Sequence, residues 1–382
     1  MIELPKSKVM IVGAGIAGLM IAHRLAQYGL HPTVVEASEK IAAGATIRNQ
    51  GWLHAGTIHA QSIADPNLST RVAQRCMYGH DYFRRFCPEA VENPTIPSLA
   101  VTLSEERIPE IIDRWEEAGV AFRPITRRSL ETRCPAILSQ NVAASWIVKD
   151  LTIDSRVVCS RLAVAIQRDG GCVFTRCRIG KLRLGDASFE SYGVEYKLSP
   201  AFVIVAAGHW TNEILTTHWN MTVAMRFWKS HLLVTRRVPG AAVFAVDDGE
   251  AGIVHHGDRS VAGMTGDNVL CLEPSNEVDQ AEAEKIRAAL SRLIAIPTDA
   301  PVVPFACTKV DIVDQASSIR NLDVEVVNVS QNVLAVFPGK MTEAPFLADI
   351  VAREVVEALN GITTNDRPID SIKVGAPVVA AL

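Results

Sequence analysis

A glycine-rich turn near the N-terminus constrains the fold more than any other feature of the sequence. Residues 9–12 form a short apolar run that ends in Gly13, and apolar residues then recur at helical spacing as far as Gly29. A second apolar run at residues 33–35 ends in Glu36. This order of strand, glycine turn, helix, strand and acid predicts a β-α-β unit that binds a dinucleotide.

The motif Gly13-Ala-Gly15-Ile-Ala-Gly18 assigns a role to each glycine. Gly13 permits the tight turn, Gly15 lets the backbone approach a pyrophosphate, and Gly18 allows the helix to pack closely on the strand. Free N–H groups at the helix N-terminus attract the anion, and Glu36 is expected to bind the ribose hydroxyls. The alternative is a glycine turn without a nucleotide. The expected cofactor contacts here are Gly13, Gly15, Ile16, Ala17, Gly18, Glu36 and Ala37.

Length and composition limit the classes of protein that remain. The 382 residues allow two or three domains, and the 48% of apolar and 21% of charged residues are typical of a folded globular chain. The net charge of −4 and the lack of a polybasic block argue against nucleic acid as a partner. No apolar stretch reaches the ~20 residues that cross a bilayer, so we expect no integral membrane association.

Cysteine usage and the start of the chain indicate the expected compartment. The eight cysteines are irregularly spaced and include no C-x-x-C pair, which argues against a zinc site and a disulfide framework. The first apolar run reads as a strand and not as a signal peptide. We therefore expect a cytoplasmic protein, and since no His, Asp or Glu set has ligand spacing, no metal.

The rest of the chain alternates strand-like and helical patterns. Strands are expected at residues 172–177, 181–184, 190–196, 201–206, 229–234 and 333–336. Helices are expected at residues 104–119, 153–166, 210–217, 276–294 and 345–359. Since the sequence contains no repeat and no linker, two interleaved domains fit better than two consecutive ones.

Four separated motifs, the first being the glycine turn, together resemble the D-amino-acid-oxidase-like superfamily of FAD-dependent oxidoreductases. Residues 44–56, G-A-T-I-R-N-Q-G-W-L-H-A-G, resemble the segment that passes along the flavin in the glycerol-3-phosphate dehydrogenase and L-2-hydroxyglutarate oxidase branches. Residues 203–210 resemble the strand and glycine turn that close over the adenine half of FAD. Residues 337–342, F-P-G-K-M-T, resemble the turn that brackets the flavin ring.

The resemblance implies FAD as cofactor and an α/β fold. A doubly wound, Rossmann-like FAD-binding domain with a β-meander is then interleaved with a mixed-sheet α+β substrate domain. The implied FAD-binding domain comprises residues 1–80, 150–222 and 325–382, and the substrate domain comprises residues 81–149 and 223–324. The further implied cofactor contacts are Thr46, Arg48, Asn49, Gln50, Gly51, Ala207, Gly208, Trp210, Gly339, Lys340, Met341 and Thr342.

Three residues are candidates for catalysis. The resemblance implies that His54 lies beside the flavin, where an imidazole can accept a hydroxyl proton as hydride leaves the same carbon; alternatively, His54 holds the loop. Lys340, beside a turn of N–H groups, would stabilise the negative charge of reduced flavin, or it is a solvated turn lysine. His231 could line the substrate face, as could one of the pair His255 and His256, whose rings point to opposite faces of a strand.

We therefore expect an enzyme that oxidises a small polar substrate at a CH–OH carbon by hydride transfer to flavin N5. Electrons would then pass to O2 or another acceptor. Thr57-Ile-His59 replaces the Arg-Tyr that is usual in the glycerol-3-phosphate branch, which weakens the case for a phosphorylated substrate. The alternatives are CH–NH oxidation of an amino acid or amine, an NAD-dependent dehydrogenase, and a non-catalytic FAD-binding subunit of a complex. The expected partner is a small-molecule substrate. Assembly with a second copy of the chain is also possible on the sequence alone.

Overall fold

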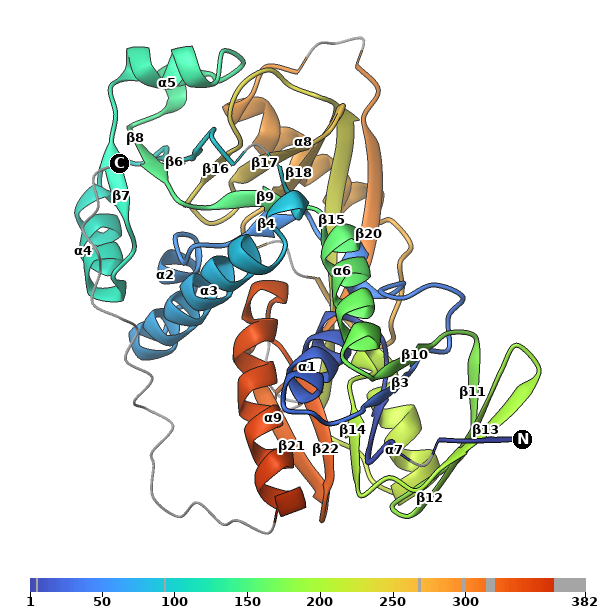
Figure 1. Ribbon diagram of the computed structural model, residues 1–382. Helices are drawn as coiled ribbons and strands as arrows, with labels where there is room; N and C mark the ends of the chain where they lie inside the picture. The colour runs from blue at the N-terminus through green and yellow to red at the C-terminus, as the bar shows by residue number, and fades with distance from the viewer. Residues whose placement is uncertain (5, 93, 267–268, 297–299, 314–319, 361–382) are drawn as a thin grey trace.

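The computed structural model describes residues 1–4, 6–92, 94–266, 269–296, 300–313 and 320–360 (Figure 1). Residues 361–382, which the sequence assigns to the first domain, lie outside the described residues. In the part that is described, no helix has the length and apolar character needed to cross a bilayer.

A six-stranded sheet contains the β-α-β unit. Its neighbouring strands are parallel except for the last pair, and the predicted strands at residues 9–12, 33–35, 201–206 and 333–336 all belong to it. The sheet has the order β10 (Cys172–Phe174), β3 (Thr33–Val35), β2 (Val9–Val12), β14 (Phe202–Val205), β22 (Val333–Phe337) and β21 (Glu325–Ser330).

Alternation of side chains lets this sheet bury both faces. In β14, Ile204 packs against the helical layer, whereas Val203 and Val205 pack on the opposite layer. The helical layer includes α1 (Ile16–Gln27), α6 (Ser155–Arg168) and α9 (Ala344–Asn360), with α1 and α9 side by side (Figure 1). The opposite layer consists of α7 (Thr211–Trp219) and a four-stranded sheet of β1 (Ile2–Glu3), β13 (Val194–Leu198), β12 (Asp186–Ser191) and β11 (Cys177–Arg183).

A nine-stranded mixed sheet forms the second body of the fold. Helix α8 (Gln280–Leu293) packs on one of its faces, and α4 (Ile108–Ala118) packs on the other. Its strands are β19 (Val269–Cys271), β15 (Met225–Arg236), β18 (Arg259–Met264), β17 (Ala251–His256), β16 (Val243–Ala245), β6 (Ser98–Thr102), β8 (Ala144–Val148) and β7 (Phe122–Pro124), with β20 (Val303–Ile312) paired to β15. The predicted α/β fold of a Rossmann-like sheet combined with a mixed-sheet body is confirmed. The domain boundaries remain a prediction.

Two of the predicted strands are wrong because turns interrupt them. The predicted strand at residues 190–196 is a hairpin between β12 and β13, whose turn residues Tyr192 and Gly193 have φ angles of 50° and 78°. The predicted strand at residues 172–177 ends at Phe174, since Arg176 with φ 51° redirects the chain into β11. Gly193 is a turn signal within the first of these runs, whereas the turn at Arg176 has no glycine or proline to indicate it.

A long helix that the sequence analysis did not identify connects the two bodies. Helix α3 (Pro66–Phe86) begins with Asp65, whose side chain accepts hydrogen bonds from the backbone N–H groups of Asn67 and Leu68. In the middle of α3, a Cβ atom added to Gly79 would lie 1.6 Å from the carbonyl oxygen of Thr342. The helix backbone therefore packs directly against the turn that precedes α9.

A histidine clamp joins the segment of residues 44–56 to the nine-stranded sheet. The Nδ1 atom of His256 on β17 lies 2.6 Å from Glu92 Oε1, and its Nε2 atom lies 2.9 Å from the carbonyl oxygen of Gln50. Both partners are acceptors, so both ring nitrogens must donate and the fitting species is the imidazolium. Burial alone would lower the pKa of His256, but the bonds to Glu92 and Gln50 raise it overall. Glu92 lies on β5 (Val91–Glu92), which shares a three-stranded sheet with β9 (Leu151–Ile153) and β4 (Trp52–Leu53).

Replacing Gly79 by alanine is expected to destabilise the protein by at least about 1–3 kcal/mol, because the new methyl group overlaps the Thr342 carbonyl. In an unobstructed helix the same change would stabilise by about 0.5–1 kcal/mol, so the sign of the effect is diagnostic. Denaturant unfolding measures it, with Gln74→Ala on the exposed face of α3 as the control. A Gly79→Ala variant more stable than the wild type would contradict the close packing.

Replacing Glu92 by glutamine should lower the free energy of unfolding by about 1–3 kcal/mol in a pH-dependent way. The folded-state pKa of His256 is raised, so the clamp stabilises fully below the unfolded pKa of 6.5 and is lost as pH rises through the folded pKa. The difference between wild type and variant should therefore be larger at about pH 6 than at about pH 9. Urea unfolding at both pH values tests this, with the exposed pair partner Glu190→Gln as the matched control. An equal difference at both pH values would refute the imidazolium assignment.

Candidate functional site

A cavity of about 1050 Å³ is formed by walls from both bodies of the fold. It slightly exceeds the ~300–1000 Å³ typical of sites for small ligands, so it suits an extended molecule. Its lining comes from segments that are far apart in sequence: 12–17, 35–38, 43–54, 206–210, 228–232 and 336–342. One end of the cavity lies where β2 and β14 end side by side, which is where doubly wound sheets bind ligands.

Close backbone packing shapes the end of the cavity at the glycine motif. Gly13 has a φ of 107°, and a Cβ atom added there would lie 2.4 Å from the carbonyl oxygen of Ala206. A Cβ on Gly18 would lie 2.0 Å from the carbonyl oxygen of Gly13, which is the predicted close packing of helix on strand. Helix α1 has no side-chain cap and no acidic residue in its first turn, so its N-terminus favours an anion.

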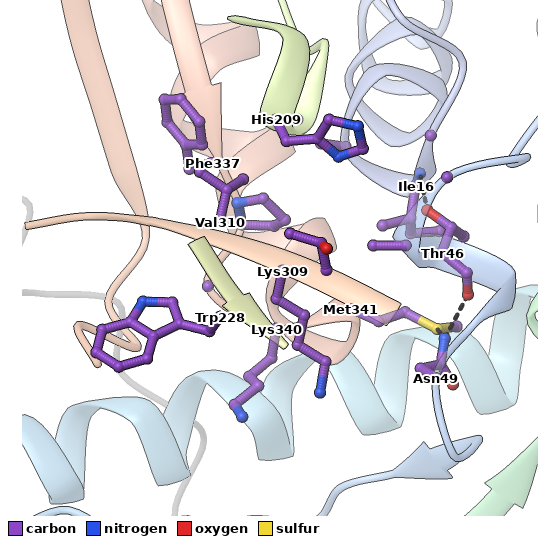
Figure 2. Close-up of a pocket in the computed structure, with 18 of the residues that line it drawn as sticks. Ile16, Thr46, Asn49, His209, Trp228, Lys309, Val310, Phe337, Lys340 and Met341 are labelled. Carbon is purple, nitrogen blue, oxygen red and sulfur yellow. Dashed lines mark hydrogen bonds between the residues drawn. The ribbon is translucent and has the colours of Figure 1, made fainter. Parts of the chain in front are cut away.

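The acid at the end of β3 is held by backbone donors. The Glu36 carboxylate accepts hydrogen bonds from the N–H groups of Ala14 at 2.9 Å and Ser38 at 2.8 Å. Each carboxylate oxygen has further lone pairs, so Glu36 can still accept a bond from a ligand hydroxyl. The Ile16 N–H donates to the Thr46 hydroxyl at 3.1 Å, which fastens residues 44–56 to the start of α1 (Figure 2).

The segment of residues 44–56 contributes many of the residues that line the cavity. Its Asn49 amide lies 3.8 Å from the Met341 sulfur, which brings together two predicted motifs that are far apart in sequence (Figure 2). Asn49 Oδ1 also accepts the Gly51 N–H at 2.7 Å. Gln50 donates to the carbonyl oxygens of Gly252 at 2.8 Å and Val261 at 3.1 Å. The segment is thus tied to the C-terminal turn and to the mixed sheet.

The turn before α9 supplies a positively charged wall. Gly339 has a φ of 63°, and a Cβ there would lie 2.4 Å from the carbonyl oxygen of Leu322, so the turn requires glycine. Lys340 extends from this turn beside Lys309 of β20 (Figure 2). Burial and the charges of Arg320 and Lys309 lower the pKa of Lys340 to about 7. A bound anion in this wall would favour the charged form of the lysine.

His54 lies on the cavity wall next to a buried carboxylate. Its Nδ1 atom is 3.5 Å from Asp150 Oδ1, and the side chain of Asp150 is fully buried. Burial lowers the pKa of His54, although Asp150 acts in the opposite direction. The imidazole is therefore neutral near pH 7 and is able to accept a proton. The ring of His59 packs edge-on against it, with ring centroids 4.4 Å apart.

The structure brings nearly all predicted site residues to this one cavity. Those that line it are Gly13, Gly15, Ile16, Ala17, Glu36, Ala37, Thr46, Asn49, Gln50, Gly51, His54, Ala207, Gly208, Trp210, His231, Gly339, Lys340, Met341 and Thr342. Gly18 is in the packing contact with Gly13 instead, and Arg48 is exposed and is not among the lining residues.

The histidines of the mixed sheet have structural partners. Asp279, which caps α8, donates its backbone N–H to His231 Nε2 at 3.1 Å, so this nitrogen is occupied on the side of α8. His231 also lines the cavity, and its catalytic role stays a prediction. His255 bonds the Ser260 hydroxyl at 2.8 Å and His256 forms the clamp, and neither lines the cavity.

Sequence reasoning missed several residues of the site. Asp150 follows β8, and its contact with residues 54–57 depends on a pairing that no local pattern indicates. Arg320 binds Asp311 through two bonds of 2.7 and 2.6 Å, and both Arg320 and Lys309 line the cavity wall. Residues 309–312, K-V-D-I, alternate between polar and apolar, and this short strand-like pattern is the signal that could have indicated Lys309.

Comparison with solved structures shows which folds the chain is similar to. L-proline dehydrogenase from P. horikoshii has a TM-score of 0.73 at 17% identity, covering 94% of this chain and 96% of that one. Glycine oxidase from Geobacillus kaustophilus has a TM-score of 0.71 at 15% identity, covering 96% and 97%. L-alpha-glycerophosphate oxidase from Mycoplasma pneumoniae, solved with FAD bound, has a TM-score of 0.70 at 18% identity, covering 94% and 95%.

Comparison of the sequence with family models shows which family the chain belongs to. No curated protein matches the chain in sequence. The model of the FAD dependent oxidoreductase family, DAO, matches residues 8–353, which includes all four motifs and both bodies of the fold. The glycine motif alone would fit NAD equally well, whereas this match extends across the mixed sheet and the turn at Gly339. The chain therefore belongs to the DAO family of FAD-dependent oxidoreductases and is an FAD-dependent enzyme.

Proposed function

We propose that this enzyme oxidises a small polar substrate at a carbon that bears a hydroxyl group, with His54 as the base that takes the hydroxyl proton. The observation that carries the proposal is the position of the His54 imidazole on the cavity wall, 3.5 Å from the buried carboxylate of Asp150. The CH–OH donor class and the role of His54 are both part of the proposal.

The residues of the cavity fit FAD along its length. The uncapped N-terminus of α1 and the close approach that Gly13 allows suit the pyrophosphate, and Glu36 has lone pairs for the ribose hydroxyls. We propose that residues 46–51 and the turn at 339–342 hold the flavin half, because Asn49 and Met341 bring these segments together. When bound, FAD supplies the hydride acceptor.

The positive charge of the wall around Lys340 and Lys309 complements this arrangement of cofactor contacts. Lys340 lies on the turn from which α9 starts and Lys309 of β20 lies beside it, so positive charge and a helix N-terminus act in the same region. We propose that Lys340, whose pKa is lowered to about 7, becomes fully charged when negative charge develops beside it. The charged lysine would then stabilise the reduced flavin without a large change in the protein structure.

A base at His54 favours hydroxyl oxidation over amine oxidation. Departure of hydride from a CH–OH carbon leaves a protonated carbonyl unless a base removes the hydroxyl proton. An uncharged amine can release hydride with the help of its own lone pair and needs no such base. The proposed alternative is CH–NH oxidation, since similar folds occur in a proline dehydrogenase and a glycine oxidase.

The donor class is tested by anaerobic reduction of the bound flavin with matched pairs of compounds. Each pair has one carbon skeleton and carries either a hydroxyl or an amino group, as in lactate and alanine, and polyols and secondary amines complete the panel. We expect loss of the visible flavin absorbance with a hydroxyl member and no loss with its amino partner. Reduction by amines alone would replace the proposal with CH–NH oxidation.

Replacing His54 by alanine should slow flavin reduction by the accepted donor about 10²- to 10⁴-fold, which is the usual contribution of a general base. FAD should stay bound, because its proposed contacts lie on other residues. Stopped-flow reduction measures the rate, and the flavin-to-protein absorbance ratio measures retention. His31→Ala is the control, since His31 bonds the Gly170 carbonyl away from the cavity. An unchanged rate in His54→Ala would exclude His54 as the base.

A further inference from the structure

We propose that Asp150 is a positioning residue that holds the His54 ring with its Nδ1–H toward the carboxylate and its Nε2 toward the cavity. This inference rests on the proposed role of His54 as the base. Asp150 is not itself among the residues that line the cavity, whereas His54, which it contacts, is one of them, so Asp150 acts through the histidine.

The register of a short sheet brings the two residues together. Strands β4 and β9 are antiparallel, with Trp52 opposite Thr152 and Leu53 opposite Leu151. Continuing this register by one residue sets position 54 opposite position 150. The contact therefore follows from backbone pairing and does not depend on the flexibility of either side chain.

The hydrogen bonds of Asp150 fix the direction of the contact. Its Oδ1 atom accepts the Ala55 N–H at 3.1 Å, and its Oδ2 atom accepts the Thr57 hydroxyl. A carboxylate held by two donors is an acceptor toward the third neighbour, which is His54 Nδ1 at 3.5 Å. The proton of the neutral ring then belongs on Nδ1, which leaves the Nε2 lone pair for the substrate hydroxyl.

Other neighbours hold the ring without competing for its proton. The Trp52 ring stacks on one side with centroids 6.4 Å apart, and the His59 ring packs edge-on. His59 Nδ1 lies 3.6 Å from the Cys76 sulfur, and burial together with nearby positive charge lowers the pKa of His59, so this ring stays neutral. Lys340 and Lys309 lower the pKa of His54, so Asp150 is the group that compensates a proton on the ring.

The first test measures the His54 ring directly and does not depend on turnover. In FAD-loaded protein labelled with 15N-histidine, NMR reports the tautomer and pKa of each ring, and the His54 signals are identified by their loss in His54→Gln. We expect the Nδ1–H tautomer in the wild type. In Asp150→Asn, the His54 pKa should fall by about 1–3 units because the compensating charge is gone. An Nε2–H tautomer in the wild type would overturn the proposal even if the variant does not fold.

A matched control separates positioning from general loss of a buried carboxylate. Asp247 also accepts a threonine hydroxyl, from Thr102 at 2.8 Å, and a backbone N–H, from Leu103 at 2.8 Å. It is nearly buried and does not line the cavity. Asp247→Asn should leave the tautomer and the pKa of His54 unchanged. An equal shift in both variants would overturn the specific role of Asp150.

The second test is the pH profile of flavin reduction. In Asp150→Asn the acid limb should move to lower pH, in step with the His54 pKa, while the maximal rate falls at least tenfold. In the His54→Ala background, Asp150→Asn should have no further effect. A further slowing there would show that Asp150 does not act through His54. If His54→Ala alone leaves the rate unchanged, the base role fails, whereas the tautomer measurement still decides whether Asp150 positions the ring.

Discussion

The site depends on contacts between backbones that leave no room for side chains. Gly13 packs against the carbonyl of Ala206, Gly18 packs against Gly13, and Gly79 packs against Thr342. The first contact joins the end of β2 to the end of β14 at the cavity, the second holds α1 against β2, and the third holds α3 against the turn that carries Lys340. A methyl group at any of these positions would overlap a backbone carbonyl, so main-chain packing and not adaptable side chains sets the distances between these segments.

Polar clamps complete this framework where backbones do not touch. The Gln50 side chain donates to carbonyls of two strands of the mixed sheet, and His256 of the same sheet donates to the Gln50 carbonyl. Asp150 binds residues 55 and 57 of the same segment. Residues 44–56 are thus fixed by groups of the mixed sheet and of the small three-stranded sheet. Because His54 belongs to this segment, its backbone is held in a fixed position. A residue that transfers a proton requires such a fixed position.

The parts of the fold and the site that could be predicted are those that a local sequence pattern indicates. The glycine turn, Glu36 and the turn at Gly339 were found because each needs residue types that few other structures require. Asp150 and Gly79 were missed for the opposite reason, since a buried aspartate and a helical glycine have meaning only through partners far along the chain. The strand pattern around His231 predicts its place on the cavity wall, but its hydrogen bond with the start of α8 is a tertiary contact that no local pattern indicates. The turn at Arg176 was missed because a bulky residue adopts positive φ there, whereas Gly193 was an available signal for the turn at Tyr192.

The contact between Asn49 and Met341 has a consequence for how the protein is made. The two residues are separated by 292 positions, and both lie on the wall proposed to hold the flavin half. During synthesis at about 5–20 residues per second, the glycine motif leaves the ribosome well before residue 341 does. The early part of the chain can therefore form its β-α-β unit, whereas the sheet around this unit still lacks β14, β21 and β22. The wall proposed to hold the flavin half is complete only after residue 341 has been synthesised.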